Sequence, residues 1–339
     1  MAFTSANFAE SWSATTTVQF LRRLTIGSRM NGAYDGDVAN NPRVHIQRPK
    51  YGDQVTKTTR YQNWEDPVQG EADQITIEID QYERTAREYF VIDQIENVVR
   101  DYIARYQTKM LHDLRVSYED SLMSYILGLS TGTPGDGVTN GRAGNVLQLA
   151  YSAAETGFSH TTGKPVGDDS KQTEARDWVL QFFTDAAVNL FRRDIDVTSS
   201  TPMIGSGSSA FWAAMPIELY IYGLARELEN KGVTREQIQR NVMAAQINGG
   251  SYGGPYRGFD IFITNSIKQP SGDDVGWDIV AASNSAVAAP MRPIRSYVTL
   301  PENAPAEKHI FRHVCDYGRG LVNSELLVLG KIGSGAVLA

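Results

Sequence analysis

The chain has 339 residues, a formal net charge of −7 and one cysteine, Cys315. An acidic chain of this kind does not resemble a general nucleic-acid binder, and one cysteine excludes an internal disulfide framework. No apolar run approaches the roughly 18 residues of a membrane span, and the first residues lack the pattern of a signal peptide. The totals therefore predict a soluble cytosolic protein with one large domain or two interleaved ones.

The first 40 residues carry scattered apolar anchors, among them Phe8, Trp12 and Phe20, separated by Ser and Thr. We expect such a segment to be ordered only where something else, for example a neighbouring subunit, offers it a surface. Arg22, Arg23 and Arg29 form a small basic cluster, which we interpret as solvated surface charge in preference to a weak contact with nucleic acid.

Residues 42–92 are predicted to be extended chain. Apolar and polar residues alternate strictly in residues 74–80, where Ile75, Ile77 and Ile79 share one face. The long polar faces favour a protruding hairpin over a buried sheet. Residues 89–92 then predict a buried strand that leads directly into a helix.

That helix is predicted over residues 93–127, because apolar residues recur there every three or four positions. Asp93 and Glu96 match a capping box, and Gly128 matches a C-terminal stop. A straight helix of this length would measure roughly 50 Å. Its apolar steps do not keep a strict heptad, so we expect a spine that lies across a sheet instead of a coiled coil.

The second half of the chain begins with a change in composition at residues 130–169, where Gly, Thr, Ser and Asp predict a loop-rich domain boundary. Helices are predicted after it at residues 171–193, at 216–228 behind Pro216, and at 234–246 with Thr234 as cap. Strands are predicted at residues 210–215, 259–264 and 277–289, followed by a long hairpin formed by 294–300 and 308–317.

Two glycine-rich motifs suggest chemistry but lack the context it needs. Residues 249–253 match GxSxG around Ser251, yet no helix can follow, so we expect a glycine-rich hairpin turn. Residues 205–210 mimic a dinucleotide fingerprint, but Pro216 interrupts the helix that would bind phosphate, and a flexible loop is the better interpretation.

The remaining titratable clusters are also weak. His309, His313 and Cys315 can share one strand face, but structural zinc sites usually need four ligands. Asp273, Asp274 and Asp278 lack the spacing of a calcium loop, and a solvated acidic turn fits them better. The sequence therefore predicts no catalytic residue, no metal site and no cofactor.

The order of elements resembles the major capsid protein of tailed bacteriophages, whose α+β coat fold is shared with encapsulin shells. Residues 74–92 feeding the helix at 93–127 carry the resemblance, together with residues 215–220 and 258–265. It implies an N-arm at 1–40, an E-loop at 41–82, a peripheral domain with the spine helix at 83–129 and 286–319, and an axial domain at 130–285 and 320–339.

The resemblance further implies self-assembly as pentamers and hexamers into an icosahedral shell around double-stranded DNA. The function would be structural and not enzymatic, in a virion capsid made in the bacterial host cytoplasm. Implied partners are other copies of the chain, a separate scaffolding protein, a portal protein, a decoration protein and packaged DNA held without sequence specificity. The chain lacks the long N-terminal extension of members with a fused scaffold, which favours a separate or cleaved one.

Extended arms bury large areas only between subunits, so the arm and loop supply the interface candidates. These are Phe8, Trp12, Phe20, Arg48, Lys50, Lys57, Arg60 and Trp64. An encapsulin-type shell around protein cargo and a GxSxG esterase remain as alternatives, and no Lys–Asn crosslink is predicted.

Overall fold

We describe the chain from a computed structural model. The described residues are 20, 24–38, 41–49, 72–90, 99–129, 147–151, 157–158, 165–166, 169–191, 211–268, 276–299 and 308–333. Within them, no helix combines the length and the apolar character that crossing a membrane requires.

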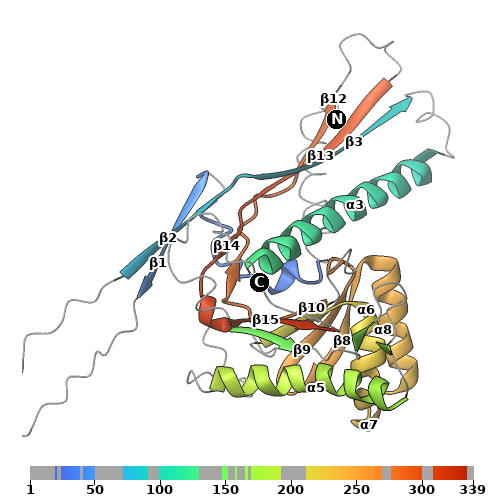
Figure 1. Ribbon diagram of the computed structural model, residues 1–339. Coiled ribbons are helices and arrows are strands. Elements are labelled where there is room, and N and C mark those ends of the chain that lie inside the picture. Colours follow the sequence, from blue (N-terminus) through green and yellow to red (C-terminus); the bar gives the residue numbers. More distant parts are fainter. Residues whose placement is uncertain are drawn as a thin grey trace, which may run out of the picture.

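A six-stranded mixed sheet forms the lower body of the molecule (Figure 1). Its strand order is β4 (Leu147–Tyr151), β15 (Leu327–Ile332), β10 (Trp277–Ser283), β7 (Phe211–Met215), β9 (Phe259–Thr264) and β8 (Gly250–Tyr256). β4 pairs with β15 and β7 with β9 in parallel, and the other pairs are antiparallel. All residues of β7 and β9 are buried, because helices cover both faces of the sheet.

Each face of this sheet belongs to its own hydrophobic cluster. On one face, Phe182 and Phe183 of α5 (Asp169–Phe191) lie in one cluster with Ile261 and Ile263. The same face carries α6 (Ile217–Leu219), the π turn η3 (Tyr220–Leu224), α7 (Ala225–Asn230) and α8 (Arg235–Asn248). On the other face, Leu122 of α3 (Val99–Gly128) shares a cluster with strand residues that include Trp212 and Phe262.

The long helix α3 extends beyond that sheet to a second, three-stranded one (Figure 1). The order there is β12 (Arg295–Thr299), β13 (Lys308–Tyr317) and β3 (Gln81–Phe90), all antiparallel. Ser117 of α3 donates to Glu83 Oε2 of β3 at 2.8 Å. The predicted spine across a sheet and the predicted hairpin of residues 294–317 are therefore confirmed, while the predicted helix start at Asp93 lies outside the described residues.

A hairpin of β1 (Arg43–Pro49) and β2 (Ala72–Glu78) extends away from both sheets, as predicted for residues 42–92 (Figure 1). Its inner face is apolar at the root, where Val44, Ile46, Ile75 and Ile77 are each at most 6 % exposed. These side chains form a third cluster with Val38 and Ala288. The part of the loop between Pro49 and Ala72 lies outside the described residues.

The helices of the second half agree with prediction closely. Thr234 caps α8 as expected, since its hydroxyl oxygen accepts from the Gln237 backbone N–H at 3.3 Å. Pro216 immediately precedes the helical segment 217–230, and the π turn within it was not predicted. The remaining short elements are η1 (Gly27–Arg29), β5 (Gly157–Phe158), β6 (Pro165–Val166), β11 (Val287–Ala288), β14 (Gly320–Leu321) and η4 (Ser324–Leu326).

Several expectations about individual segments were wrong. Residues 24–38 are not dependent on a neighbour for order, because Ile26 and Val38 are fully buried within their own chain. Residues 147–151, inside the region predicted to be loop-rich, form strand β4. The motif around Ser251 is not a turn but strand β8, and the turn of that hairpin lies at Arg257 and Gly258, both with positive φ.

Candidate functional site

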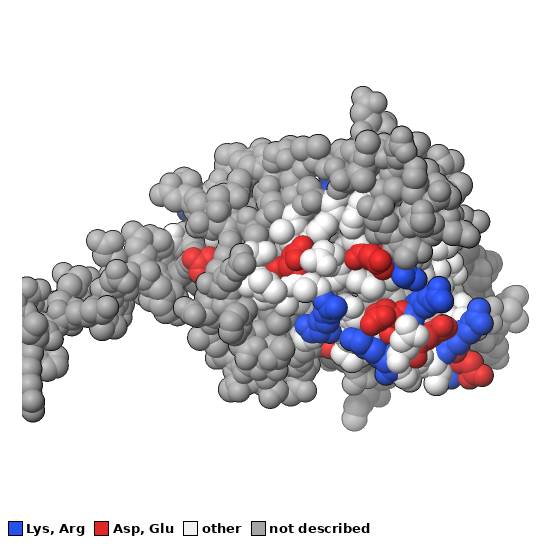
Figure 2. All heavy atoms as spheres, turned by 60° about the horizontal axis from the view of Figure 1, so that its bottom comes forward, with Lys and Arg blue, Asp and Glu red and all other residues white. Residues whose placement is uncertain are grey.

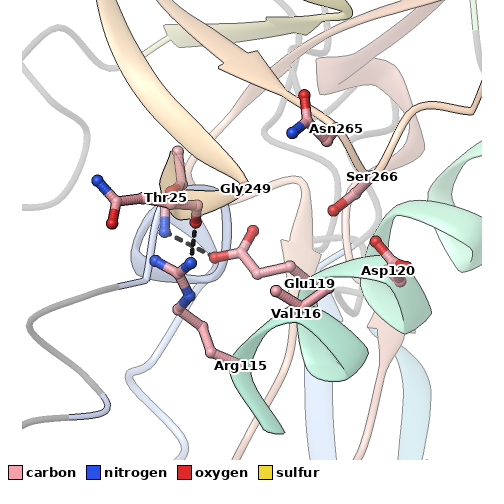
Figure 3. A pocket seen from close by; sticks show the side chains of 9 residues that line it. Thr25, Arg115, Val116, Glu119, Asp120, Gly249, Asn265 and Ser266 are labelled. Atoms are coloured by element: carbon pink, nitrogen blue, oxygen red, sulfur yellow. Dashed lines mark hydrogen bonds between the residues drawn. The ribbon is translucent and has the colours of Figure 1, made fainter. Parts of the chain in front are cut away.

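A polar junction holds residues 24–27, the middle of α3 and the end of α8 together (Figure 3). It surrounds a pocket of about 80 Å³ lined by side chains that include Thr25, Arg115, Glu119 and Asn265. Pockets for drug-sized ligands are typically about 300–1,000 Å³. This pocket has room for ordered water but not for a substrate of that size.

Glu119 fastens the N-terminal segment to α3. Its carboxylate accepts hydrogen bonds from the backbone N–H groups of Thr25 at 2.6 Å, Ile26 at 3.0 Å and Gly27 at 3.3 Å. These donors lie at the start of η1, where helical N–H groups have no partner within the helix. Burial raises the pKa of Glu119, and the three N–H donors and Arg115 oppose that rise.

Arg115 lies one turn before Glu119 and reaches in the other direction. Its Nη2 donates to the carbonyl of Asn248, the last residue of α8, and lies 3.1 Å from His112 Nδ1. The next residue, Gly249, has φ of 74°, so the chain turns sharply away from the helix. One buried Arg–Glu pair on α3 thus joins two segments that are far apart in sequence.

The sequence contained no signal for this junction. The Arg115–Glu119 spacing of four residues is common on solvated helix faces. Only the tertiary contacts, with partners about 90 and 130 residues away, identify the pair as buried. The role of the Arg115–Glu119 pair is structural, because it connects distant segments of the chain.

A second polar cluster fastens the chain where it enters the hairpin. Arg292 donates to the carbonyl of Val38 at 2.9 Å and to that of Asn41 at 3.1 Å. Asp35 accepts from the Met291 N–H at 3.1 Å, and burial raises the pKa of Asp35. The region around Met291 and Arg292 therefore positions the root of β1.

The residues considered for catalysis lie apart from one another. Ser251 lies in β8 opposite Ile263, in extended chain without the strand–turn–helix geometry of a nucleophile elbow. His309 and His313 lie on β13, in a different sheet. The arrangement therefore gives no support to the esterase interpretation, and residues 205–210 lie outside the described residues.

Two of the residues that were weighed against a metal site, His313 and Cys315, belong to the core. His313 and Cys315 are fully buried on one face of β13, and His313 Nδ1 lies 2.9 Å from Ser296 Oγ. Burial lowers the pKa of His313 to about 4 and raises the pKa of the Cys315 thiol. In the part of the chain that is described, no three His, Cys, Asp or Glu side chains gather in a way that could hold a metal. Asp278 lies 4.0 Å from Lys331 Nζ across the β10–β15 pair.

The structure describes two of the interface candidates, Phe20 and Arg48. Phe20 is 1 % exposed and packs edge-on against Tyr118 of its own chain, with 5.7 Å between ring centroids. Because its ring has no exposed surface left to contact another subunit, we do not propose Phe20 as an interface residue. Arg48 lies in β1 opposite Asp73. The other six candidates lie outside the described residues: Phe8, Trp12, Lys50, Lys57, Arg60 and Trp64.

Surface charge is mixed on the face seen in Figure 2, where Lys and Arg side chains lie among Asp and Glu. On α7 and α8, Arg240 lies 3.9 Å from Glu236, and Arg235 lies 3.9 Å from Glu229. Arg29 is not the solvated charge that we expected, because it pairs with Asp260 at 3.5 Å and lies over the Phe262 ring. The described residues of this face form no basic patch.

Neither protein-family models nor curated proteins match the sequence, but solved structures do. A structure from Mycobacterium phage Che8 matches over 91% of this chain and 90% of its own, with TM-score 0.53 and 16% identity. The capsid structure of cyanophage P-SCSP1u matches over 88% and 85%, with TM-score 0.55 and 9% identity. The mature capsid of bacteriophage PhiM1 matches over 86% and 82%, with TM-score 0.53 and 13% identity. At such low identity these matches establish a common fold over nearly the whole chain.

Proposed function

We propose that this chain, which has the α+β coat fold of phage major capsid proteins, is a capsid subunit of a tailed phage. Copies of it would assemble as pentamers and hexamers into an icosahedral shell around double-stranded DNA. The observation that carries the proposal is the agreement of fold over 86–91% of the chain with phage structures, two of them described as capsids.

The shape of the molecule supports a role in assembly. The hairpin β1–β2 extends away from the body, and beyond its root, which packs on its own chain, it can bury further area only against another copy. An apolar side chain buried there would contribute roughly 1.5–3 kcal/mol. A shell closes when such head-to-tail contacts close. We place the arm and loop candidates other than Phe20 in this interface.

The domain assignment follows the same proposal. The three-stranded sheet with the first part of α3 would belong to the peripheral domain, and the six-stranded sheet with α5 and α8 to the axial domain. A separate scaffolding protein, a portal protein, a decoration protein and packaged DNA would be the partners. The chain would act as a structural protein in the virion capsid, after synthesis in the host cytoplasm.

Negative-stain microscopy of the purified chain, paired with size-exclusion light scattering, tests the proposal. Closed shells, or rings of five or six subunits, are the expected result. A strict monomer at high concentration, unchanged by salt or a crowding agent, would contradict it. Nucleic acid inside the shells would separate a phage capsid from a shell that encloses protein.

Ser251 provides an independent check on the structural role. Because it lies in strand β8 and not on the strand–turn–helix elbow that exposes a reactive serine, a fluorophosphonate probe should leave it unmodified. The variant Ser251→Ala is the matched control. Stoichiometric labelling that disappears in this variant would support the esterase interpretation over the structural one.

A further inference from the structure

Two glycines, Gly318 and Gly320, lie in close contact with the hairpin β1–β2 where it meets the body. We call this contact the seat of the hairpin. A Cβ atom on Gly318 would lie 2.5 Å from the carbonyl oxygen of Glu78, and one on Gly320 would lie 2.7 Å from Cγ1 of Ile77. Neither glycine has positive φ. The need for glycine therefore comes from the approach of β2 and not from the backbone conformation of the glycines.

The body side of this seat is fixed by hydrogen bonds. The Gly318 N–H donates to the carbonyl of Pro290 at 2.9 Å, and Gly320 pairs with Ala288 in the β11–β14 ladder. Added volume at either glycine would therefore have to be accommodated mainly by movement of β2.

The hairpin is joined to the body close to the same two glycines. Only Ile79 and Asp80 separate β2 from β3, whose first residue, Gln81, pairs with Tyr317 immediately before Gly318. The Ile79 N–H donates to the carbonyl of Pro42 at 2.8 Å and closes the hairpin root. The direction of the whole hairpin is thus determined within a few residues of the seat.

We propose that Gly318 and Gly320 are positioning residues that set the direction of the hairpin β1–β2 relative to the body, and with it the geometry at which copies of the chain meet. The second half of this statement rests on the proposed function, and the first half does not. At Gly318→Ala the opposing carbonyl must retreat by at least about 0.5 Å for the contact to reach 3.0 Å. Along a seven-residue pair of strands, roughly 20 Å long, rotation at the root enlarges that movement toward the tip.

Distance measurements between two spin labels on the full chain test the first half. One label is attached at Gln74→Cys, an exposed position of β2, and the other at Met243→Cys, which is 59 % exposed on α8. The native Cys315 is fully buried and stays unlabelled. We expect Gly318→Ala and Gly320→Ala each to shift the mean distance between the labels.

Matched variants separate this effect from general destabilisation. Gly36→Ala is the control, because a Cβ there meets no atom within 4 Å, and it should leave the distance unchanged. Combining Gly320→Ala with Ile77→Ala removes the two nearest atoms, Cγ1 and Cδ1 of Ile77, so that the Ile77 Cβ, at 3.7 Å, becomes the nearest of the three atoms closest to the new methyl group. This double variant should restore the parent distance although it loses a core side chain.

Unchanged distances in folded Gly318→Ala and Gly320→Ala variants would overturn the proposal, and if Gly318→Ala does not fold, Gly320→Ala decides. Microscopy of the same variants tests the second half, with shells of altered diameter or open sheets expected. Shells of parental diameter despite a shifted hairpin would overturn that half. If the parent chain forms no shells, the proposed function fails while the label distances still decide the role of the seat.

Discussion

Glu119 and His313 are both buried, and burial shifts their pKa values in the direction that disfavours the charged form. For Glu119 this means a raised pKa, and for His313 a lowered one. The two side chains therefore link stability to pH with opposite signs. Each can be tested by a single isosteric or near-isosteric change.

His313 should make the protein less stable in acid. Its pKa is about 4 in the fold against 6.5 in the unfolded chain, so the unfolded chain binds the proton first as the pH falls. The stabilisation is complete above pH 6.5 and is lost on the way to about pH 4, by on the order of 3 kcal/mol. Urea unfolding over this range should show a fall in stability that is larger in the parent than in His313→Gln by about this amount. The exposed His45→Gln is the control, and it should keep the parental pH dependence.

Glu119→Met should destabilise the chain, because it removes both carboxyl oxygens that accept from the N–H groups of residues 25–27. We expect a loss of about 1–3 kcal/mol in acid. The raised pKa means that the Glu119 contribution is complete below pH 4.5 and declines as the pH rises through its folded pKa. The difference between parent and variant in urea unfolding should therefore narrow toward neutral pH.

Hydrogen exchange locates the Glu119 effect. Exchange at Thr25, Ile26 and Gly27 should become faster in Glu119→Met, since both acceptor oxygens are lost. Asp120→Asn changes the neighbouring carboxylate of the same pocket and should leave exchange at these three amides as in the parent. Equal protection in both variants would mean that the carboxylate does not hold the N-terminal segment.

At the scale of elements, the sequence predicts well where the signal is local. The apolar spacing of α3 and α5, the Thr234 cap and the Pro216 boundary all depend on residues within a turn or two of each other. The elements that were missed depend on distant partners. β4 is short and, among the described strands, pairs only with β15, about 180 residues later. β8 is glycine-rich and is a strand because β9 pairs with it. The Glu119 junction was missed for the same reason.

Breaking α3 at its middle should disrupt the whole chain, because its last part helps to form the core on one face of the six-stranded sheet. Met110 is 2 % exposed, and Met110→Pro removes a helical hydrogen bond at a cost of about 3 kcal/mol or more. We expect loss of helical circular dichroism and an insoluble or unfolded product. Met110→Leu nearly conserves volume and should fold. A folded Met110→Pro protein with parental helicity would contradict a single continuous helix.

At the scale of the whole molecule, stability and assembly should be separable at the tip of the hairpin. Pro49 and Ala72 form the last described pair of β1 and β2. Replacing residues 50–71 with Asn-Gly joins the strands by a favoured two-residue turn and keeps the root cluster of Ile75 and Ile77. Thermal unfolding should be as in the parent, and shells should be absent.

The same experiment can separate the effect of the length of residues 50–71 from the effect of their side chains. A Gly/Ser segment of equal length keeps the reach of the loop but removes Lys50, Lys57, Arg60 and Trp64. It should also fail to form shells if these side chains make the contacts between copies. Normal particles from both variants would remove the loop from the interface.

The order of strands in the six-stranded sheet has a consequence for synthesis. β15 lies between β4 and β10 although it follows every other strand along the chain, and β4 has no other strand beside it in the described sheet. The sheet therefore remains open on the ribosome until residues 327–332 have emerged. Neither hydrophobic cluster of the sheet is complete before then, because Leu327 and Leu329 belong to one cluster and Val328 and Ile332 to the other.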